Sequence, residues 1–380
     1  MQSGRTSVGA RFARAPNVCL CNNIFTRRAL YINLSHNIGI GWYQYNNLKA
    51  SASTVIMLSS IVLFASLVNL VSSAAVNNIR PLVIWHGMGD TYASPGMDSF
   101  QSEVKEMYPG IFVHSIYIDE DPNVDQRAGF YGNVNQQIVQ VAQQLAEIPE
   151  LSRGFDAIGF SQGGQFLRGY VERNNSPPVH NLITFGSQHM GVSSLPACNT
   201  WDLLCRVARR AANRGVYSEW AQDNLVQAQY FRDPHRLSQY MESGSFLPDI
   251  NNEVLLPSSR NLSYADNLAS LNKLVLVLFL QDKTVVPKES AWFGSEQPIE
   301  DITMDQASGS HQTPMFGGVN TKDIIPMHLQ NLYKEDWIGL RQLDERGRID
   351  FVACQGEHMH IGDCWKDLVA EWVGGSLGAD

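Results

Sequence analysis

Short apolar runs alternate with segments of helical periodicity through much of the chain. After the second run, Asn133–Leu151 repeats apolar residues every three or four positions, which predicts a helix. A second helix is expected to end before Pro177. The alternation predicts a mostly parallel central sheet with helices on both faces, an α/β fold. The runs expected to form its strands are Arg80–Asp90, Gly110–Ile118, Phe155–Phe160, His180–Ser187, Asn272–Asp282 and the one that begins at Ile349.

The alternation stops between about Cys198 and Leu268. Residues 200–231 have a mostly helical pattern with several aromatic side chains, and 245–264 are irregular and rich in Pro, Asn and Ser. No Gly/Ser-rich or Pro-rich linker divides the chain on either side. We therefore expect a single domain at 75–380, with one insertion at about 190–270 that forms a helical lid over the strand ends.

The first 74 residues differ from the rest. No acidic residue precedes Asp90, and Met57 opens an apolar stretch that ends in small residues. Its core, Ile61–Val71, is too short to span a bilayer, which takes about 20 residues. We interpret 57–74 as a signal peptide cut near Ala74, and 1–56 as a leader outside the mature protein. A mitochondrial presequence is the second interpretation of the leader, and a membrane anchor is the third.

Charge excludes two classes of partner. The sequence has 380 residues, of which 44% are hydrophobic and 17% charged, as in ordinary globular proteins. Beyond Ala74, 22 of the 28 basic residues remain against all 37 acidic ones, a net charge of −15. Such a chain is unsuited to bind nucleic acid or an anionic membrane, and we expect no stable membrane span.

The cysteines agree with secretion. Two of the six fall in the leader, and the other four form the local pairs Cys198 with Cys205 and Cys354 with Cys364. Even numbers at close spacing in a secreted chain predict disulfides, with free buried thiols as the alternative. No C-x-x-C pair is present, so we expect no metal site. The sequon at Asn261 predicts N-glycosylation.

A serine lies between glycines directly after a predicted strand. The stretch from Gly159 to Gly163 fits G-x-S-x-G, with Ser161 at its centre and a helical pattern after it. A sharp, strained turn there would present the hydroxyl at a helix N-terminus, where partial positive charge stabilises a developing anion. A purely structural strand–helix turn is the alternative. The context favours a nucleophile elbow.

A nucleophilic serine needs a histidine that is oriented by a carboxylate. In this architecture the acid and then the histidine follow the serine along the chain, each after a strand. Asp282 ends one predicted strand, and His358 is the first histidine after another. His360 is the alternative base. A bridge between Cys354 and Cys364 would restrict the loop that carries His358.

The oxyanion of an acyl-transfer reaction needs two backbone N–H donors. Gln162 follows the nucleophile and supplies one. The loop "HGMGD", after the first strand, places Met88 between two glycines as the second donor. A plain turn is the alternative for this loop.

Several motifs together resemble the palmitoyl-protein thioesterase family. They are "LVIWHGMGD", "GFSQGGQFLRGYVER", "LVQAQYFRDP", "FLQDKTVVP" and "GEHMHI", and the resemblance runs from about Arg80 to the C-terminus. It implies an α/β-hydrolase fold with a helical lid and delivery to the lysosome, while secretion follows from the signal segment. Val286 stands where the family often has a second Asp, and a family cysteine pair near the nucleophile helix is absent. The residues implied by the resemblance are the triad Ser161, Asp282 and His358, the oxyanion donors Met88 and Gln162, the disulfide Cys198–Cys205 and the sequon at Asn261.

The expected function is that of a serine thioesterase without a cofactor. It would hydrolyse palmitoyl and other long-chain acyl thioesters of S-acylated cysteines in proteins or peptides, through an acyl-serine, and would also accept acyl-CoA. An apolar groove under the lid would hold the chain, because each buried CH₂ contributes about 0.8 kcal/mol. The alternatives are an oxygen-ester lipase or esterase on the same fold, and a non-catalytic lipid-binding protein.

Overall fold

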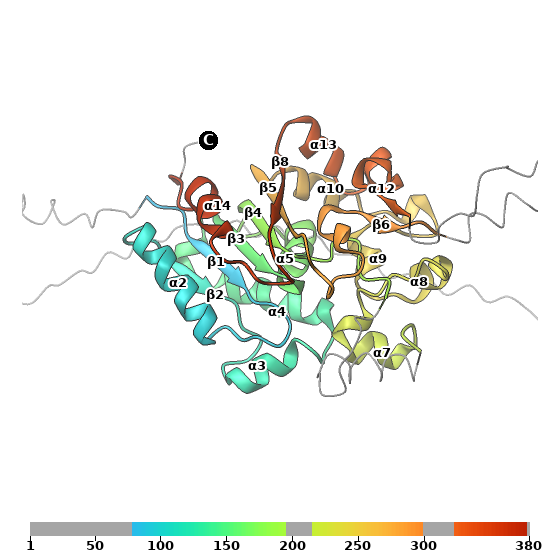
Figure 1. Cartoon of the computed structure of the whole chain (residues 1–380), viewed down its shortest axis with the longest axis horizontal. Coiled ribbons are helices and arrows are strands. Elements are labelled where there is room, and N and C mark those ends of the chain that lie inside the picture. Colours follow the sequence, from blue (N-terminus) through green and yellow to red (C-terminus); the bar gives the residue numbers. More distant parts are fainter. Residues whose placement is uncertain (1–77, 195–214, 299–322, 378–380) are drawn as a thin grey trace, which may run out of the picture. The chain divides into compact units, whose positions relative to one another are not determined.

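A central sheet of six parallel strands organises the protein in the computed structural model (Figure 1). The structure describes residues 78–194, 215–298 and 323–377, all within one compact unit, Ala74–Asp380. Every neighbouring pair is parallel, so the predicted α/β architecture is confirmed. The strand order is β2 (Val113–Ser115), β1 (Leu82–Trp85), β3 (Phe155–Phe160), β4 (Val179–Phe185), β5 (Lys273–Phe279) and β8 (Ile349–Cys354).

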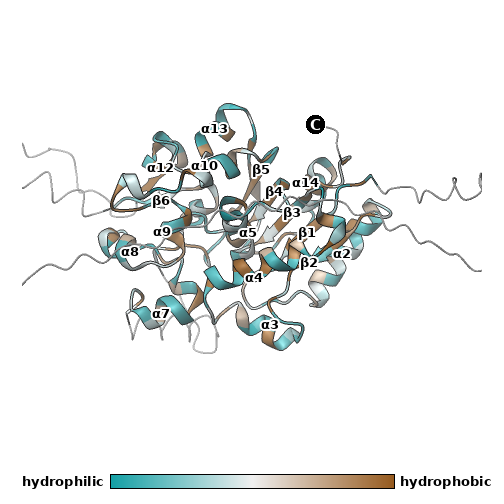
Figure 2. Cartoon of the chain, turned by 180° about the vertical axis from the view of Figure 1, so that it is seen from behind, coloured by the Kyte–Doolittle hydropathy of each residue, from teal (hydrophilic) through white to brown (hydrophobic). Residues whose placement is uncertain are grey.

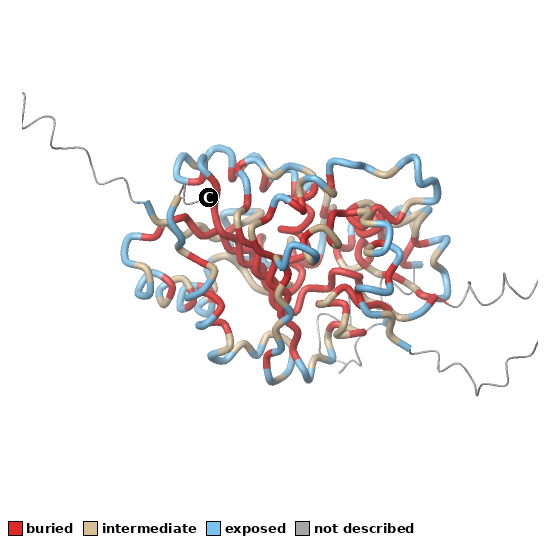
Figure 3. The backbone as a smooth tube through the Cα atoms, turned by 90° about the horizontal axis from the view of Figure 1, so that it is seen from above, coloured by how far each residue is buried: buried red, intermediate tan, exposed pale blue. Residues whose placement is uncertain are grey.

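Helices cover both faces of this sheet. Along β1, Val83 and Trp85 join the core under α4 (Val134–Ala146) and α5 (Gln162–Arg173). Leu82 and Ile84 join the opposite core, under α2 (Pro95–Met107) and α14 (Cys364–Trp372). Alternate side chains of a strand point to opposite faces, which explains the uninterrupted apolar strands. Figure 3 shows the strands as a buried centre, and Figure 2 shows α4 with both apolar and polar positions.

Helix α2 was not predicted from the sequence, although its signals are present. Ser94 caps it by accepting a hydrogen bond from the N–H of Met97, and Pro95 occupies the first turn. Its buried side chains, Met97, Phe100 and Val104, follow helical spacing. This helix lies beside the candidate site.

The insertion predicted at about 190–270 is described at 190–194 and 215–270. It contains α7 (Glu219–Asn224), α8 (Leu237–Ser243), α9 (Leu247–Ile250) and α10 (Leu262–Ala269). The segment expected to be irregular includes α9, and α10 packs against α5 as part of the helical layer. The remaining elements are α3 (Pro122–Ala128), β6 (Ser295–Glu296), β7 (Ile324–Ile325), α12 (Asn331–Lys334), α13 (Leu340–Glu345) and the 3₁₀ helices Pro149–Leu151, Val226–Ala228, Pro257–Ser259, Lys288–Trp292 and Met327–Leu329.

Some predictions lie outside the described residues. These are the leader, the signal peptide at 57–74 and the pair Cys198–Cys205. Within the described residues, no helix has the length and apolar character that crossing a bilayer demands.

Candidate active site

Ser161 occupies a sharp turn between β3 and α5. Its backbone has φ 52° and ψ −123°, a conformation that non-glycine residues rarely adopt. Neighbouring backbones pack so closely that a side chain cannot fit at the flanking glycines. A Cβ on Gly159 would lie 2.2 Å from the Cα of Gly164, and one on Gly163 would lie 2.4 Å from the carbonyl oxygen of Trp85. The glycines therefore permit the strained turn that presents the serine.

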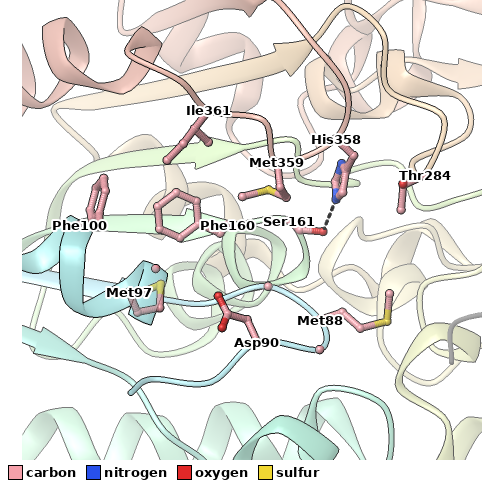
Figure 4. Close-up of a pocket in the computed structure, with 13 residues that line it drawn as sticks. Met88, Asp90, Met97, Phe100, Phe160, Ser161, Thr284, His358, Met359 and Ile361 are labelled. Carbon is pink, nitrogen blue, oxygen red and sulfur yellow. Dashed lines mark hydrogen bonds between the residues drawn. The ribbon is translucent and has the colours of Figure 1, made fainter. Parts of the chain in front are cut away.

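The structure brings the three predicted triad residues together at the C-terminal ends of β3, β5 and β8. The Nε2 of His358 lies 3.0 Å from the Oγ of Ser161, and its Nδ1 lies 2.6 Å from the Oδ2 of Asp282 (Figure 4 shows the first contact). The Asp282 side chain is 2% exposed and that of His358 is 13% exposed. The imidazole can thus accept the hydroxyl proton at one nitrogen while the carboxylate holds the other.

Asp282 is itself held in place by backbone donors. Its Oδ1 accepts hydrogen bonds from the N–H groups of Thr284 and Val285, at 2.8 and 3.0 Å. This leaves Oδ2 for the imidazole of His358. Asp282 can therefore hold its own turn with one carboxylate oxygen and orient the imidazole with the other.

The loops that carry the acid and the histidine are joined to each other. The N–H of Leu280 donates to the carbonyl of Cys354, and the N–H of Gln281 donates to that of Gly356. The predicted disulfide Cys354–Cys364 is present and spans the loop that carries His358. His360, the alternative base, is exposed and lines no part of the pocket beside Ser161.

The predicted oxyanion donors flank the serine. Gln162 is the first residue of α5, and Met88 lines the same pocket as Ser161. The loop of Met88 approaches the serine closely, because a Cβ on Gly87 would lie 3.3 Å from the Cβ of Ser161. Two side chains of the insertion contact these donors: Gln227 reaches the sulfur of Met88, and the hydroxyl of Tyr230 donates to the side chain of Gln162.

A cavity of about 400 Å³ opens beside Ser161 (Figure 4). Its apolar lining comes from the loop after β1, from α2, from β3 and from the loop after β8, and no residue from the described parts of the insertion lines it. Sequence reasoning missed this lining, since helix α2 had not been predicted. The apolar side chains that line the cavity are Met88, Met97, Phe100, Phe160, Met359 and Ile361.

Three further histidines among the described residues contact partners outside the triad. His189 is fully buried, where its Nε2 contacts the hydroxyl of Thr184, and burial lowers its pKa well below the usual value. His328 pairs with Asp344 at 2.9 Å. His86 is buried against Asp125.

In the part of the chain that the structure describes, no group of three or more His, Cys, Asp or Glu side chains could hold a metal ion.

The parallel sheet, its strand order and the serine turn at the end of β3 define an α/β-hydrolase. Comparison with known sequences identifies the family within this class of protein. A family model described as palmitoyl protein thioesterase matches residues 81–358. The chain belongs to the palmitoyl-protein thioesterase family, and it is an enzyme that hydrolyses thioesters.

Individual relatives agree with the family match. Palmitoyl-protein thioesterase 1 of Caenorhabditis elegans is 40% identical over 74% of this chain and 87% of its own length. Palmitoyl-protein thioesterase 3 of Dictyostelium discoideum is 33% identical over 80% of this chain and 91% of its own. The lysosomal thioesterase PPT2 homolog of Drosophila melanogaster is 28% identical, over 77% and 90%.

Solved structures resemble the chain more distantly. A carboxylesterase structure from Nitrososphaera gargenis has a TM-score of 0.35 and 15% identity, over 78% of this chain and 89% of that one. A score this low carries no weight, and the fold assignment rests on the sheet topology.

Proposed function

We propose that this enzyme removes long acyl chains, palmitoyl among them, from S-acylated cysteines of proteins and peptides. In this proposal Ser161 is the nucleophile, His358 the general base and Asp282 the group that orients the imidazole. The main support for this proposal is that His358 contacts both other residues at the wall of an apolar cavity. Its imidazole lies 2.6 Å from the carboxylate of Asp282 and 3.0 Å from the hydroxyl of Ser161.

The first step forms an acyl-serine. The Oγ of Ser161 attacks the thioester carbonyl carbon while its proton moves to the Nε2 of His358. The C–S bond then breaks, and the imidazolium returns the proton to the departing sulfur. A cysteine thiolate, with an ordinary pKa near 8.5, leaves more readily than an alkoxide. In the second step water attacks the acyl-serine while its proton moves to the imidazole. The ester C–O bond to Oγ then breaks, the imidazolium returns the proton to Ser161, and the fatty acid leaves.

The negative charge of each tetrahedral intermediate would rest on the N–H groups of Met88 and Gln162. The second lies at the N-terminus of α5, so the helix dipole adds to its effect. Removing one such donor typically costs a factor of about 10² to 10³ in turnover.

The cavity fits an apolar chain. The CH₂ groups of a palmitoyl chain offer at most about 11 kcal/mol of burial free energy, at about 0.8 kcal/mol each. The lining side chains of α2 are apolar, as are Met359 and Ile361 of the loop after β8, although Asp90 also borders the cavity. Acyl-CoA carries the same thioester and is proposed as a further substrate. The helical lid at about 190–270 remains part of the proposal.

We also propose a route through the secretory pathway to the lysosome, with residues 57–74 as the signal peptide and 75–380 as the single mature domain. The relative from Drosophila is named a lysosomal thioesterase. Asn261, the proposed glycosylation site, is exposed at the start of α10, where its Oδ1 accepts from the N–H and hydroxyl of Ser263. The described disulfide Cys354–Cys364 supports an oxidising route.

A buried carboxyl group suits the enzyme to an acidic compartment. Burial raises the pKa of Glu172 to about 8, although Arg168 and Arg173 oppose the shift. Its folded pKa exceeds the unfolded value, so the group stabilises the fold at low pH and loses this contribution between about pH 4.5 and pH 8. Glu172→Gln keeps the shape without the titration, so its melting temperature relative to wild type should rise by a few degrees, about 3 °C, from pH 5 to pH 7.5.

Thermal melting at both pH values checks this expectation. Glu106→Gln is the matched control, because Glu106 is exposed on α2. The expectation fails if the two variants show the same pH dependence relative to wild type.

Labelling with a fluorophosphonate tests the proposed nucleophile. We expect one adduct, on Ser161, and loss of both labelling and turnover in Ser161→Ala. Turnover of an S-palmitoyl peptide is then compared with that of its O-palmitoyl serine analogue. Faster turnover of the oxygen ester would support the lipase alternative, and binding of palmitate without labelling or turnover would support a lipid carrier.

A further inference from the structure

His86 lies directly before the loop that carries Met88, and both of its ring nitrogens face oxygen atoms. Its Nδ1 lies 2.9 Å from the carbonyl oxygen of Gly87, and its Nε2 lies 3.1 Å from the Oδ2 of Asp125. The side chain is 3% exposed, so water does not replace either contact. A carbonyl oxygen only accepts hydrogen bonds, and a neutral imidazole has a single N–H. The contact with Gly87 therefore requires a proton on Nδ1. The Nε2 atom faces Oδ2 of Asp125 at ion-pair distance without a well-aligned hydrogen bond, so this second contact is attractive only if the ring carries two protons or Asp125 carries one.

The surroundings of Asp125 favour the first arrangement. Its Oδ1 accepts from the N–H of Ile118 at 2.7 Å, and its Oδ2 accepts from the N–H of Tyr92 and faces the hydroxyl of Thr91. The backbone donors stabilise the ionised carboxylate, whose side chain is fully buried. An ionised Asp125 makes His86 an imidazolium. The pair also holds both ends of the Met88 loop, since Thr91 and Tyr92 bind the same carboxylate.

The contact between His86 and the carbonyl of Gly87 affects the reaction because this carbonyl is part of the peptide group between Gly87 and Met88. The carbonyl of Gly87 and the N–H of Met88 belong to the same planar group, and in a trans peptide they point in opposite directions. A donor that fixes the carbonyl therefore also fixes the direction of the N–H. Gly87 accepts a second hydrogen bond, from the N–H of Asp90 at 3.3 Å, but only His86 brings a charge.

We propose that His86, held doubly protonated by Asp125, is a positioning residue that aims the N–H of Met88 at the oxyanion. This inference rests on the proposed function, because it presumes that Met88 is an oxyanion donor. His86 touches neither substrate nor Ser161 in this role. It acts by fixing the peptide that does.

The electrostatics of the site agree with this geometry. Burial lowers the pKa of His86, but the adjacent carboxylate of Asp125, the carbonyl of Gly87 and the charge of Asp90 together raise it above the usual value. Among the described residues, these two carboxylates are the charged groups that act on the ring. Because its pKa is raised, His86 keeps its second proton at acidic pH and loses it as pH rises. Turnover should then fall on the alkaline side, whereas the need for an unprotonated His358 makes it rise on the acidic side.

Two variants of His86 separate the contacts. In His86→Asn the amide occupies the position of Nδ1, so it can donate to Gly87 without a charge and without titrating. In His86→Gln the amide reaches the position of Nε2, which retains Asp125 and loses Gly87. We expect His86→Asn to keep kcat within about 10-fold and to lose the alkaline fall. His86→Gln should lower kcat by about 10- to 100-fold at every pH, which is part of the cost of losing an oxyanion donor. Its KM should stay within about 2-fold of the wild-type value.

The measurement is kcat and KM for an S-palmitoyl peptide between pH 4 and pH 9, on variants whose melting confirms a folded protein. His328→Asn is the matched control, because it removes another histidine that pairs with an aspartate. An alkaline fall that persists in His86→Asn overturns the role of His86 and leaves the proposed function intact. Wild-type turnover that survives Ser161→Ala overturns the proposed function instead.

If the variants do not fold, the protonation of His86 can be measured in the wild-type enzyme. With ¹⁵N-labelled histidine, both ring nitrogens of His86 should be protonated at the pH of highest kcat, and one proton should be lost across the alkaline fall. A neutral His86 ring at the pH of highest kcat overturns the proposal.

Discussion

Asp282→Asn is expected to lower kcat on a palmitoyl thioester by about four orders of magnitude while KM changes little. The backbone N–H groups of Thr284 and Val285 require an acceptor at Oδ1, so the asparagine must turn its NH₂ toward His358. That NH₂ donates to Nδ1 and drives the imidazole proton to Nε2, where it blocks acceptance of the serine proton. A wrong tautomer in an otherwise intact triad costs about 10⁴ in kcat. Steady-state kinetics and single-turnover acylation measure the effect.

A matched substitution controls for the loss of a carboxylate. Asp350 follows the start of β8, where it pairs with Lys273 at the opposite end of the strand from His358. Asp350→Asn should change kcat by less than about 2-fold, because a partly exposed ion pair contributes little. If Asp282→Asn retained more than a tenth of wild-type kcat, the orienting role of Asp282 would be wrong.

Gly163→Ala should destabilise the fold by about 3 kcal/mol, at the upper end of the usual cost of overpacking, and lower the melting temperature by on the order of 10 °C. The added methyl would lie 2.4 Å from the carbonyl oxygen of Trp85 and 2.5 Å from that of His86. Neither backbone atom can move without separating β1 from the start of α5. Alanine is itself the better helix former by about 1 kcal/mol, so the loss is caused by this contact alone.

A glycine-to-alanine substitution in a helix where the added methyl has room should not lower the melting temperature. Gly96 lies in the first turn of α2, and the nearest atom to an added Cβ is 3.9 Å away. Gly96→Ala should therefore leave the melting temperature unchanged or raise it slightly. Differential scanning calorimetry of both variants compares them, and equal melting temperatures would contradict the packing argument at Gly163.

The parts of the structure that the sequence predicts best are those with local signals. The strand Phe155–Phe160 matches β3 at both ends, because an uninterrupted apolar run meets a glycine turn. The three triad candidates follow from the order of serine, acid and histidine after successive strands, and the structure brings them within hydrogen-bonding distance.

The cavity and the His86 pair depend instead on contacts between distant segments. The cavity lining combines α2 with the loop after β8, and no local pattern indicates that these segments meet. His86 precedes the serine along the chain, so its position excluded it as the base. Its partner Asp125 belongs to α3, a helix that sequence reasoning did not identify.

The Cys354–Cys364 cross-link has a practical consequence for anyone who makes this enzyme. It closes the loop from which His358 reaches Ser161, so the placement of the base depends on the oxidation of these two cysteines. Protein expressed in a reducing cytoplasm, or assayed with a strong thiol reductant, would carry that loop untethered. Its measured rate would then describe an enzyme with a less restrained catalytic histidine than that of the cross-linked protein.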